Sequence, residues 1–211
     1  MRQLTKAALL GGAALLAGWI SWGVYSNRSA ESVPYERLET LDGVELRQYP
    51  RTVLVETTAP DQITAFRRLF RYISGTNEGD ESIAMTAPVQ TTPGRQISMT
   101  APVRSASAGG DDGSVRMAFY LPAEYSHETA PAPTESTVRL VVEPPKRLAV
   151  RRFSWYAPNR RVRRQERKLL STLELEGIDT QGDPFLLRYN DPWTPPFMRR
   201  NEVAIRVSDA T

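Results

Sequence analysis

The feature that most constrains the fold of this chain is an internal repetition of element order. The first half contains two strand-like runs, a helical run and a further strand, at residues 44–49, 52–58, 61–75 and 115–121. The second half repeats this order and ends on two strands, at residues 138–142, 147–153, 160–175, 185–189 and 201–207. Such a duplication predicts an α+β domain with pseudo-twofold symmetry, in which two flanking helices cover a curved or barrel-like antiparallel sheet.

Both helices carry start and stop signals. The first follows Pro60-Asp61 and ends at Gly75, and its apolar residues recur at helical spacing, at Ile63, Phe66, Leu69, Phe70 and Ile73. The second follows Pro158-Asn159 and ends at Gly177, with Val162, Leu169, Leu170 and Leu173 on one side. Each helix is therefore expected to cover one face of the sheet.

One seven-residue segment occurs nearly twice, as IAMTAPV at residues 83–89 and ISMTAPV at residues 97–103. The two copies flank TTPGRQ, in which Pro93-Gly94 is a turn signal. The pattern predicts a hairpin whose prolines, Pro88 and Pro102, stand at edge or bulge positions.

The inventory of reactive side chains excludes most familiar enzyme chemistries. The chain has no cysteine and a single histidine, His127, which lies in a Pro- and Ser-rich stretch. Disulfides, thiolate metal sites, two-histidine metal sites and histidine-dependent triads are therefore unavailable, and no catalytic or metal-ligating residue is predicted. The net charge is +3, and Arg2 and Lys6 in the N-terminal segment supply two of these charges, so nucleic acid is not an expected partner.

Residues 7–25 form a run of 19 residues without a charge, which at 1.5 Å per residue just spans a bilayer core of about 30 Å. The aromatic residues Trp19, Trp22 and Tyr25 favour an uncleaved membrane anchor over a signal peptide. Residues 1–30 are thus expected to be a transmembrane or signal helix and residues 34–208 an extracytoplasmic domain, periplasmic if the source is a Gram-negative bacterium.

Several segments resemble the SOUL haem-binding family over about residues 34–207. They are YISGTN at 72–77 followed by IAMTAPV, MAFYLP at 117–122, and the closing motif YNDPWTPPFMRRNEV at 189–203. The resemblance implies a distorted barrel of two repeats with two flanking helices. It also implies reversible, non-covalent binding of haem or another tetrapyrrole in a shallow apolar groove beside the first helix, and a carrier or buffer rather than an enzyme.

The candidate site residues follow from that groove. Phe66 and Phe70, with Ile73, offer a flat apolar wall, and Arg67 and Arg71 offer cations for the two propionates. Met85 and Met99, from the doubled segment, offer thioether contacts or weak axial ligation. Each type also has an ordinary explanation, because apolar stripes are usually core, surface arginines are usually solvated and methionines usually fill gaps.

Other features lie outside this groove. His127 belongs to no segment that matches the family, so no ligand role carries over to it. The six basic residues within 160–168 are interpreted either as a solvated face or as a contact for anionic lipid headgroups. In the closing motif, Pro192, Pro195 and Pro196 fix an extended loop, which is interpreted as structural closure or as a second rim of the groove.

Two alternatives to haem binding remain open. The same groove would suit another amphiphilic small molecule or an interacting protein. A tetrapyrrole-modifying enzyme is less favoured, because it needs an acid/base pair and the nearest carboxylates, Glu78, Asp80 and Glu81, lie in a solvated loop pattern.

Overall fold

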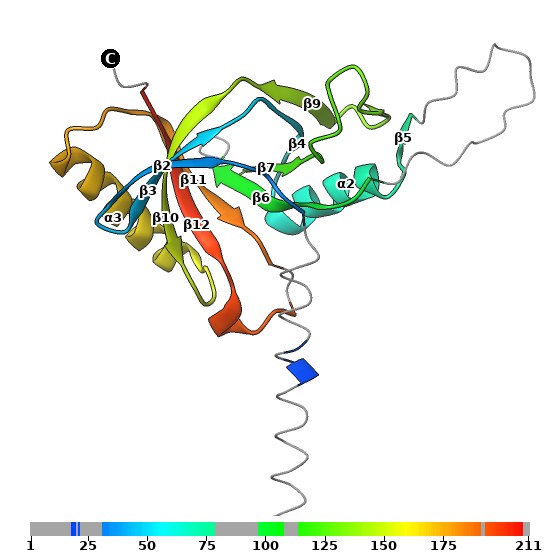
Figure 1. Ribbon diagram of the computed structural model, residues 1–211. Coiled ribbons are helices and arrows are strands. Elements are labelled where there is room, and N and C mark those ends of the chain that lie inside the picture. Colours follow the sequence, from blue (N-terminus) through cyan, green and yellow to red (C-terminus); the bar gives the residue numbers. More distant parts are fainter. Residues whose placement is uncertain are drawn as a thin grey trace, which may run out of the picture.

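The computed structural model describes residues 31–78, 97–107, 114–190 and 193–208, together with residues 18, 19 and 21 (Figure 1). The strands before the first helix are β1 (Glu31–Ser32), β2 (Glu36–Leu41), β3 (Val44–Tyr49) and β4 (Thr52–Ala59), and that helix is α2 (Gln62–Ile73). Between the helices lie β5 (Asn77–Glu78), β6 (Thr100–Ser107), β7 (Val115–Tyr120), β8 (Ala132–Pro133), β9 (Val138–Glu143) and β10 (Lys146–Phe153). The second helix, α3 (Asn159–Leu175), precedes β11 (Thr180–Arg188), a 3₁₀ turn η1 (Pro196–Met198) and β12 (Asn201–Val207).

The strand order of the main sheet is symmetric about its centre. It runs β2-β3-β10-β12-β11-β6-β7-β4-β9, and β1 pairs with β6 in parallel while the other neighbours are antiparallel. From the β6–β11 pair outward, β7 corresponds to β12 and β4 to β10. The first strand of each half crosses to the other half, since β3 pairs with β10 and β9 with β4. The duplicated element order thus yields a pseudo-twofold axis between β6 and β11.

The prediction of a distorted antiparallel β-barrel is wrong, because β2 and β9 end the sheet on opposite sides without pairing to each other. The exchange of β3 and β9 between halves lengthens the sheet at both ends and leaves no described strand to join them. At one of these ends β2 (ERLETL) is exposed along most of its length and carries charged side chains, which is typical of a protected sheet edge.

The two helices are confirmed close to their predicted bounds. Asp61 caps α2, its carboxylate accepting hydrogen bonds from the backbone N–H groups of Ile63 at 2.8 Å and Thr64 at 2.9 Å. Gly75 follows α2 with φ +109°, in the left-handed region that favours glycine. Gly177 does the same after α3 with φ +67°.

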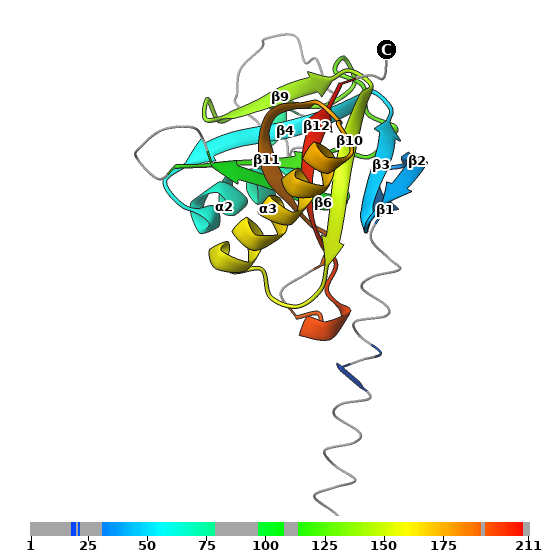
Figure 2. The same cartoon turned by 90° about the vertical axis from the view of Figure 1, so that its left-hand side faces the viewer.

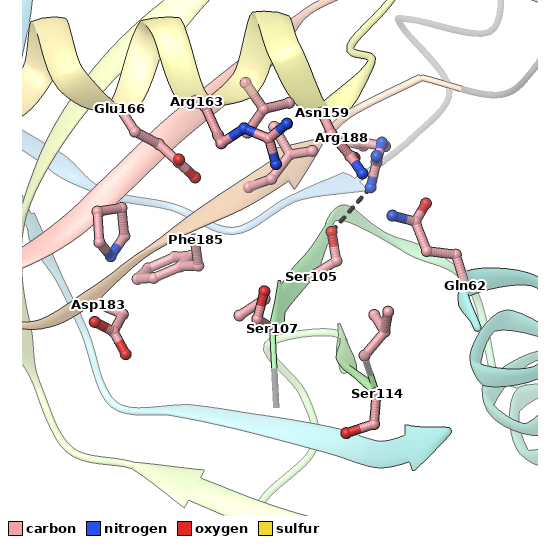
Figure 3. Close-up of a pocket in the computed structure, with 15 residues that line it drawn as sticks. Gln62, Ser105, Ser107, Ser114, Asn159, Arg163, Glu166, Asp183, Phe185 and Arg188 are labelled. Carbon is pink, nitrogen blue, oxygen red and sulfur yellow. Dashed lines mark hydrogen bonds between the residues drawn. The ribbon is translucent and has the colours of Figure 1, made fainter. Parts of the chain in front are cut away.

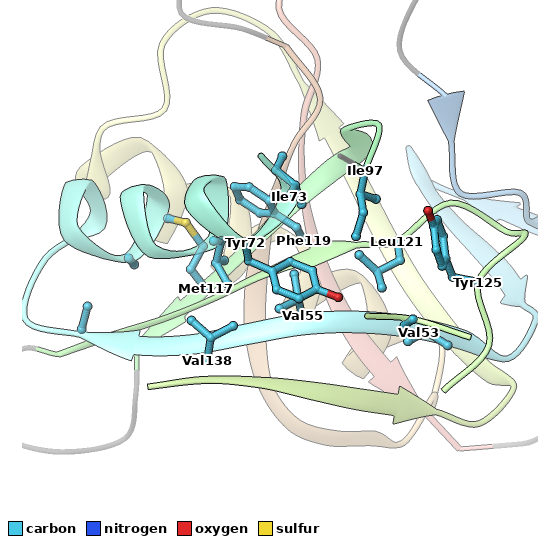
Figure 4. Packing of buried hydrophobic residues seen from close by; sticks show 14 residues of the cluster. Val53, Val55, Tyr72, Ile73, Ile97, Met117, Phe119, Leu121, Tyr125 and Val138 are labelled. Carbon is cyan, nitrogen blue, oxygen red and sulfur yellow. The ribbon is translucent and has the colours of Figure 1, made fainter. Parts of the chain in front are cut away.

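Alternation along the strands separates three apolar clusters. Val53, Val55 and Phe119 pack under α2, as Figure 4 shows for the cluster around Tyr72 and Ile73. Ala149 and Val203 pack under α3. The side chains between them point to the other face, where residues including Leu54, Leu148, Leu187 and Ala204 form the third cluster. Both helices lie on one side of the curved sheet (Figure 2).

The closing motif forms part of a buried ionic network. Glu202 accepts hydrogen bonds from the guanidinium of Arg47 at 2.8 and 3.1 Å, from the Tyr189 hydroxyl at 2.8 Å and from Arg200 Nε at 2.8 Å. Arg199 Nε donates to the carbonyl of Thr194 at 2.9 Å. These contacts link the motif to β3 and to the end of β11, which is compatible with structural closure. The predicted extended loop is only partly correct, because Pro196 lies in the 3₁₀ turn η1, and residues 191 and 192 lie outside the described residues.

Two predictions fall largely on residues that the structure does not describe. Among the described residues no helix has the length and apolar character needed to cross a membrane, and most of residues 7–25 are outside that set. The first MTAPV copy, with Met85, and the Pro93-Gly94 turn are also outside it. The second copy enters β6, where the register with β7 shifts between Thr100 and Val103, so Pro102 stands at a bulge as predicted.

Candidate ligand-binding surface

Helix α2 has an apolar side that does not face the sheet. Its buried residues are Ala65, Leu69, Tyr72 and Ile73. On another side Ile63, Phe66 and Phe70 are 66%, 39% and 48% exposed. These three residues, here called the α2 ridge, are spaced three and four residues apart and therefore lie along one line of the helix. Exposed apolar groups gathered in this way are typical of a binding surface.

The ridge is ordered by aromatic contacts. The rings of Phe66 and Phe70 stack with centroids 5.8 Å apart and an interplanar angle of 15°. Phe66 also meets buried Phe119 of β7 edge to face, with centroids 5.4 Å apart. The two exposed rings thus form an ordered aromatic surface that is anchored from below by Phe119. The inclusion of Ile73 in this wall is wrong, since Ile73 packs into the core beneath α2.

The two predicted propionate partners, Arg67 and Arg71, differ in whether a carboxylate of the protein already pairs with them. Arg67 and Arg71 are both exposed on α2. The guanidinium of Arg71 forms a two-point pair with Glu135, from Nε to Oε1 at 2.9 Å and from Nη2 to Oε2 at 2.9 Å. An anionic ligand at Arg71 therefore has to compete with Glu135, and Arg67 is the more accessible cation.

Of the two methionines predicted to contact the ligand, the structure describes only Met99. Met99 is exposed, and its neighbour Ile97 donates its backbone N–H to the carbonyl of Ile73 at 2.8 Å, at the C-terminal end of α2. Met85 lies outside the described residues. His127 is exposed in the loop that follows β7. In the described part of the chain, no three His, Cys, Asp or Glu side chains gather in a way that would hold a metal ion.

A second feature, which sequence reasoning missed, is a cleft of about 490 Å³ between α2 and α3 over β6 and β11 (Figure 3). Its floor includes Ser105, Leu186 and Arg188, and its walls include Gln62 of α2 and the first two turns of α3. Arg188 Nη1 donates to the Ser105 hydroxyl at 2.9 Å, and burial lowers the pKa of Arg188. The one sequence signal that could have indicated the cleft is Arg188, a charged residue directly after the apolar residues 185–187 of a predicted strand.

The ridge and the cleft adjoin. Gln62, which lines the cleft, is followed at four-residue intervals by Phe66 and Phe70, so all three lie along the same row of α2. An apolar ridge beside a cleft with both apolar and charged walls is typical of a domain that binds amphiphilic small molecules.

Comparison with known proteins assigns the family. The family model described as SOUL heme-binding protein matches residues 30–206, and the chain belongs to that family, as its sequence motifs predict. Heme-binding protein 1 of Mus musculus is 26% identical over 190 residues, which cover 86% of this chain and 88% of the mouse protein.

Two solved structures share the fold at low sequence identity. The EcmrR C-terminal domain has a TM-score of 0.55 and 11% identity, with 83% of this chain and 99% of that chain covered. An uncharacterized conserved protein from Listeria innocua has a TM-score of 0.50 and 13% identity, with coverage of 85% and 94%. The α+β architecture with its two helices is therefore shared with these proteins.

Proposed function

We propose that this chain binds haem reversibly and non-covalently on the α2 ridge, as a carrier or buffer rather than an enzyme. The observation that carries the proposal is the exposed Phe66–Phe70 stack beside the accessible cation of Arg67. Membership of a haem-binding family and similarity to a protein named heme-binding protein 1 support haem as the ligand.

The residues present fit such a ligand. From Ile63 to Phe70 the ridge is about 10 Å long at 1.5 Å per residue, and it offers aromatic faces on which a flat macrocycle can stack. Arg67 is placed to pair with a propionate. Arg71 can pair with the other propionate if that carboxylate replaces Glu135 as its partner. Met99 offers a weak thioether ligand near the end of α2. Binding that depends on apolar contact and exposed ion pairs favours exchange over permanent retention.

The test is titration of the full chain with haem, followed by the Soret band and by quenching of tryptophan fluorescence. Phe70→Ser should weaken binding about five- to tenfold, because roughly half of a phenylalanine transfer energy of about 2–3 kcal/mol is lost. Leu175→Ser is the matched control, since Leu175 is an apolar residue of α3 that is 84% exposed. The proposal would be refuted if added haem changed neither the Soret band nor the tryptophan fluorescence, or if Phe70→Ser and Leu175→Ser lost equal haem affinity.

The cations provide a second arm of this test. The double variant Arg67→Glu and Arg71→Glu should weaken haem binding more than His127→Ala does, because it replaces both expected propionate partners with carboxylates. A larger loss with His127→Ala would instead show that the exposed loop histidine ligates the iron.

We propose further that residues 7–25 anchor the chain in a membrane with the domain on the extracytoplasmic side. The uncharged run and its aromatic residues support this. Exposed cations of α3, including Arg164, Arg167 and Lys168, would then meet anionic headgroups. Fractionation of cells with protease access to the domain tests the topology, and salt-sensitive binding to phosphatidylglycerol vesicles tests the lipid contact. Recovery in the soluble cytoplasmic fraction would refute the anchor.

A further inference from the structure

We infer that the cleft between α2 and α3 is a binding site for an organic carboxylate, with Arg188 as its anchor. This site is different from the Arg67 and Arg71 positions on α2. Three observations lead to it: the position and pairing of Arg188, the start of α3 at the cleft, and the distribution of charge and apolar surface along the cleft.

Arg188 stands on the helix side of the sheet. In the antiparallel β6–β11 pair, Leu186 lies opposite Ser105 and Arg188 opposite Val103. Val103 packs against the cluster under α2 and Leu186 belongs to the cluster under α3, so all four side chains share the face that the helices cover. The Arg188 guanidinium is thus directed into the floor of the cleft, where Figure 3 shows it beside Ser105.

The pairing of Arg188 differs from that of the three arginines that the structure holds in buried or half-buried carboxylate pairs. Arg47 and Arg200 pair with Glu202, and Arg104 pairs with Glu143 at 2.6 Å. Arg188 is half-buried and has the Ser105 hydroxyl as its partner, and in the described part of the chain no carboxylate pairs with it. A desolvated guanidinium gains most from a carboxylate, whose two oxygens match its forked N–H groups.

Helix α3 adds a second cationic contribution. Asn159, Val162 and Arg163, in the first turns of α3, line the cleft. Pro158 at the N-cap supplies no side-chain hydrogen bond, and the first turn contains no acidic residue. The partial positive charge of a helix N-terminus is therefore not compensated locally, and it favours an anion at the same end of the cleft as Arg188.

The cleft is not uniformly cationic, because Glu166 and Asp183 also line it. Figure 3 shows these two carboxylates on the side of Phe185, and Arg188 with Asn159 and Gln62 on the other side. The arrangement has one acidic end and one cationic end, to which Arg163 contributes, and apolar residues such as Val162 and Leu186 also line the cleft. It suits a monocarboxylate with an apolar body, and a second carboxylate at the far end of the ligand is unfavourable.

The volume and surroundings specify the occupant further. A cleft of about 490 Å³ is within the range of small-molecule sites. Because the α2 ridge adjoins the cleft, the carboxylate can belong to a free amphiphile or to a propionate of haem seated on the ridge. The second source rests on the proposed function, and the first does not.

Calorimetric titration of the full chain with octanoate, octan-1-ol and octanedioate tests the inference. Octanoate should bind about tenfold more tightly than octan-1-ol, because only octanoate makes the charged hydrogen bonds. It should also bind more tightly than octanedioate. Arg188→Gln should remove this preference, and Arg152→Gln, which changes an exposed cation of β10, should retain it.

A second variant tests the site independently of the stability of Arg188→Gln. Asn159→Asp places a carboxylate in the first turn of α3, where it favours the helix but repels an anionic ligand. It should weaken octanoate binding without lowering the thermal midpoint. Equal affinity for octanoate and octan-1-ol, or octanoate binding unchanged in Arg188→Gln and in Asn159→Asp, would overturn the inference.

Haem titration with and without saturating octanoate distinguishes the two sources. Displacement of haem by octanoate, with weaker haem binding in Arg188→Gln, identifies the propionate as the carboxylate. If haem binding is unchanged by octanoate and by Arg188→Gln, the cleft is a separate site for a free carboxylate. Either of these two results supports a carboxylate site in the cleft. A chain that binds octanoate through Arg188 but does not bind haem would refute the proposed function alone.

Discussion

The substitution Glu202→Gln tests the buried network that joins the closing motif to β3. The Glu202 side chain is fully buried, and it accepts hydrogen bonds from Arg47, Tyr189 and Arg200. Glutamine has nearly the same shape but carries no charge, and its amide group has N–H donors where two guanidinium groups also donate. The substitution therefore removes the charge and creates a clash of donors with little change in volume.

The magnitude depends on what remains around Arg47, which is 1% exposed. Loss of one partner from a buried ion pair costs about 3–5 kcal/mol, because the other charge is left uncompensated. Arg47 Nε still donates to Glu45 Oε2 at 2.8 Å, and this carboxylate keeps part of the compensation. We therefore expect a cost near the lower end, about 3 kcal/mol, which is a large fraction of the 5–15 kcal/mol that is typical of a domain.

Equilibrium unfolding in urea, followed by tryptophan fluorescence, measures this loss. Glu56→Gln is the control, because Glu56 pairs with an exposed arginine, Arg139, at 2.6 Å. Surface pairs contribute about 1 kcal/mol or less. A cost for Glu202→Gln below about 1 kcal/mol, or equal to that of the control, would refute the reasoning. The double variant Arg47→Met with Glu202→Leu should recover part of the lost stability, since the buried charge of Arg47 is removed together with its partner. The recovery should be incomplete, because Arg200 and Tyr189 still lose Glu202 as their acceptor.

Acidification should act on the same network. Burial opposes ionisation of Glu202, but the hydrogen bonds and charge of Arg47 outweigh it and lower the pKa of Glu202. Stability from this group is present above the unfolded pKa of about 4.3 and is lost as pH falls through the folded pKa, so the thermal midpoint should fall in that range and less in Glu202→Gln. Asp61→Ala should cost about 1 kcal/mol of unfolding free energy in urea, because two N–H groups of α2 lose their acceptor; an unchanged midpoint would contradict the cap. Glu166→Gln should narrow the preference for octanoate over octanedioate about two- to fivefold by removing charge from the acidic end of the cleft, and a constant ratio in calorimetry would contradict that reading.

Local patterns predicted the elements of this fold but not how the sheet ends. The helices at Gln62–Ile73 and Asn159–Leu175 follow from apolar spacing and from nearby start and stop signals. Closure of the sheet depends on pairing between the halves, such as β3 with β10, whose strands are about 100 residues apart along the chain. Periodicity within a strand contains no information on its partner, so an open sheet and a barrel were equally compatible with the pattern.

The candidate site was predictable only in part for a similar reason. Phe66, Phe70 and Ile73 share helical spacing, but a stripe this wide cannot lie wholly against the sheet, and the structure buries Ile73 and exposes the two phenylalanines. Only the packed position of α2 decides which part of the stripe is free. The cleft was not predictable, because Ser105 and Arg188 are 83 positions apart and are brought together by the pairing of the two halves.

Helices α2 and α3 occupy equivalent positions in the two halves, but part of their exposed surface differs in chemical character. A shift of 100 residues aligns their buried positions, pairing Ala65, Leu69, Tyr72 and Ile73 with Gln165, Leu169, Thr172 and Leu173. Under this shift Ile63 and Phe66 of the α2 ridge correspond to Arg163 and Glu166, which line the cleft on α3. A duplicated fold with identical halves would place two equivalent walls around the axis between β6 and β11. Here two apolar residues of α2 face two charged residues of α3 in this correspondence, although Phe70 corresponds to apolar Leu170. This asymmetry favours a ligand that is itself amphiphilic, such as a porphyrin with its propionates or a long-chain carboxylate.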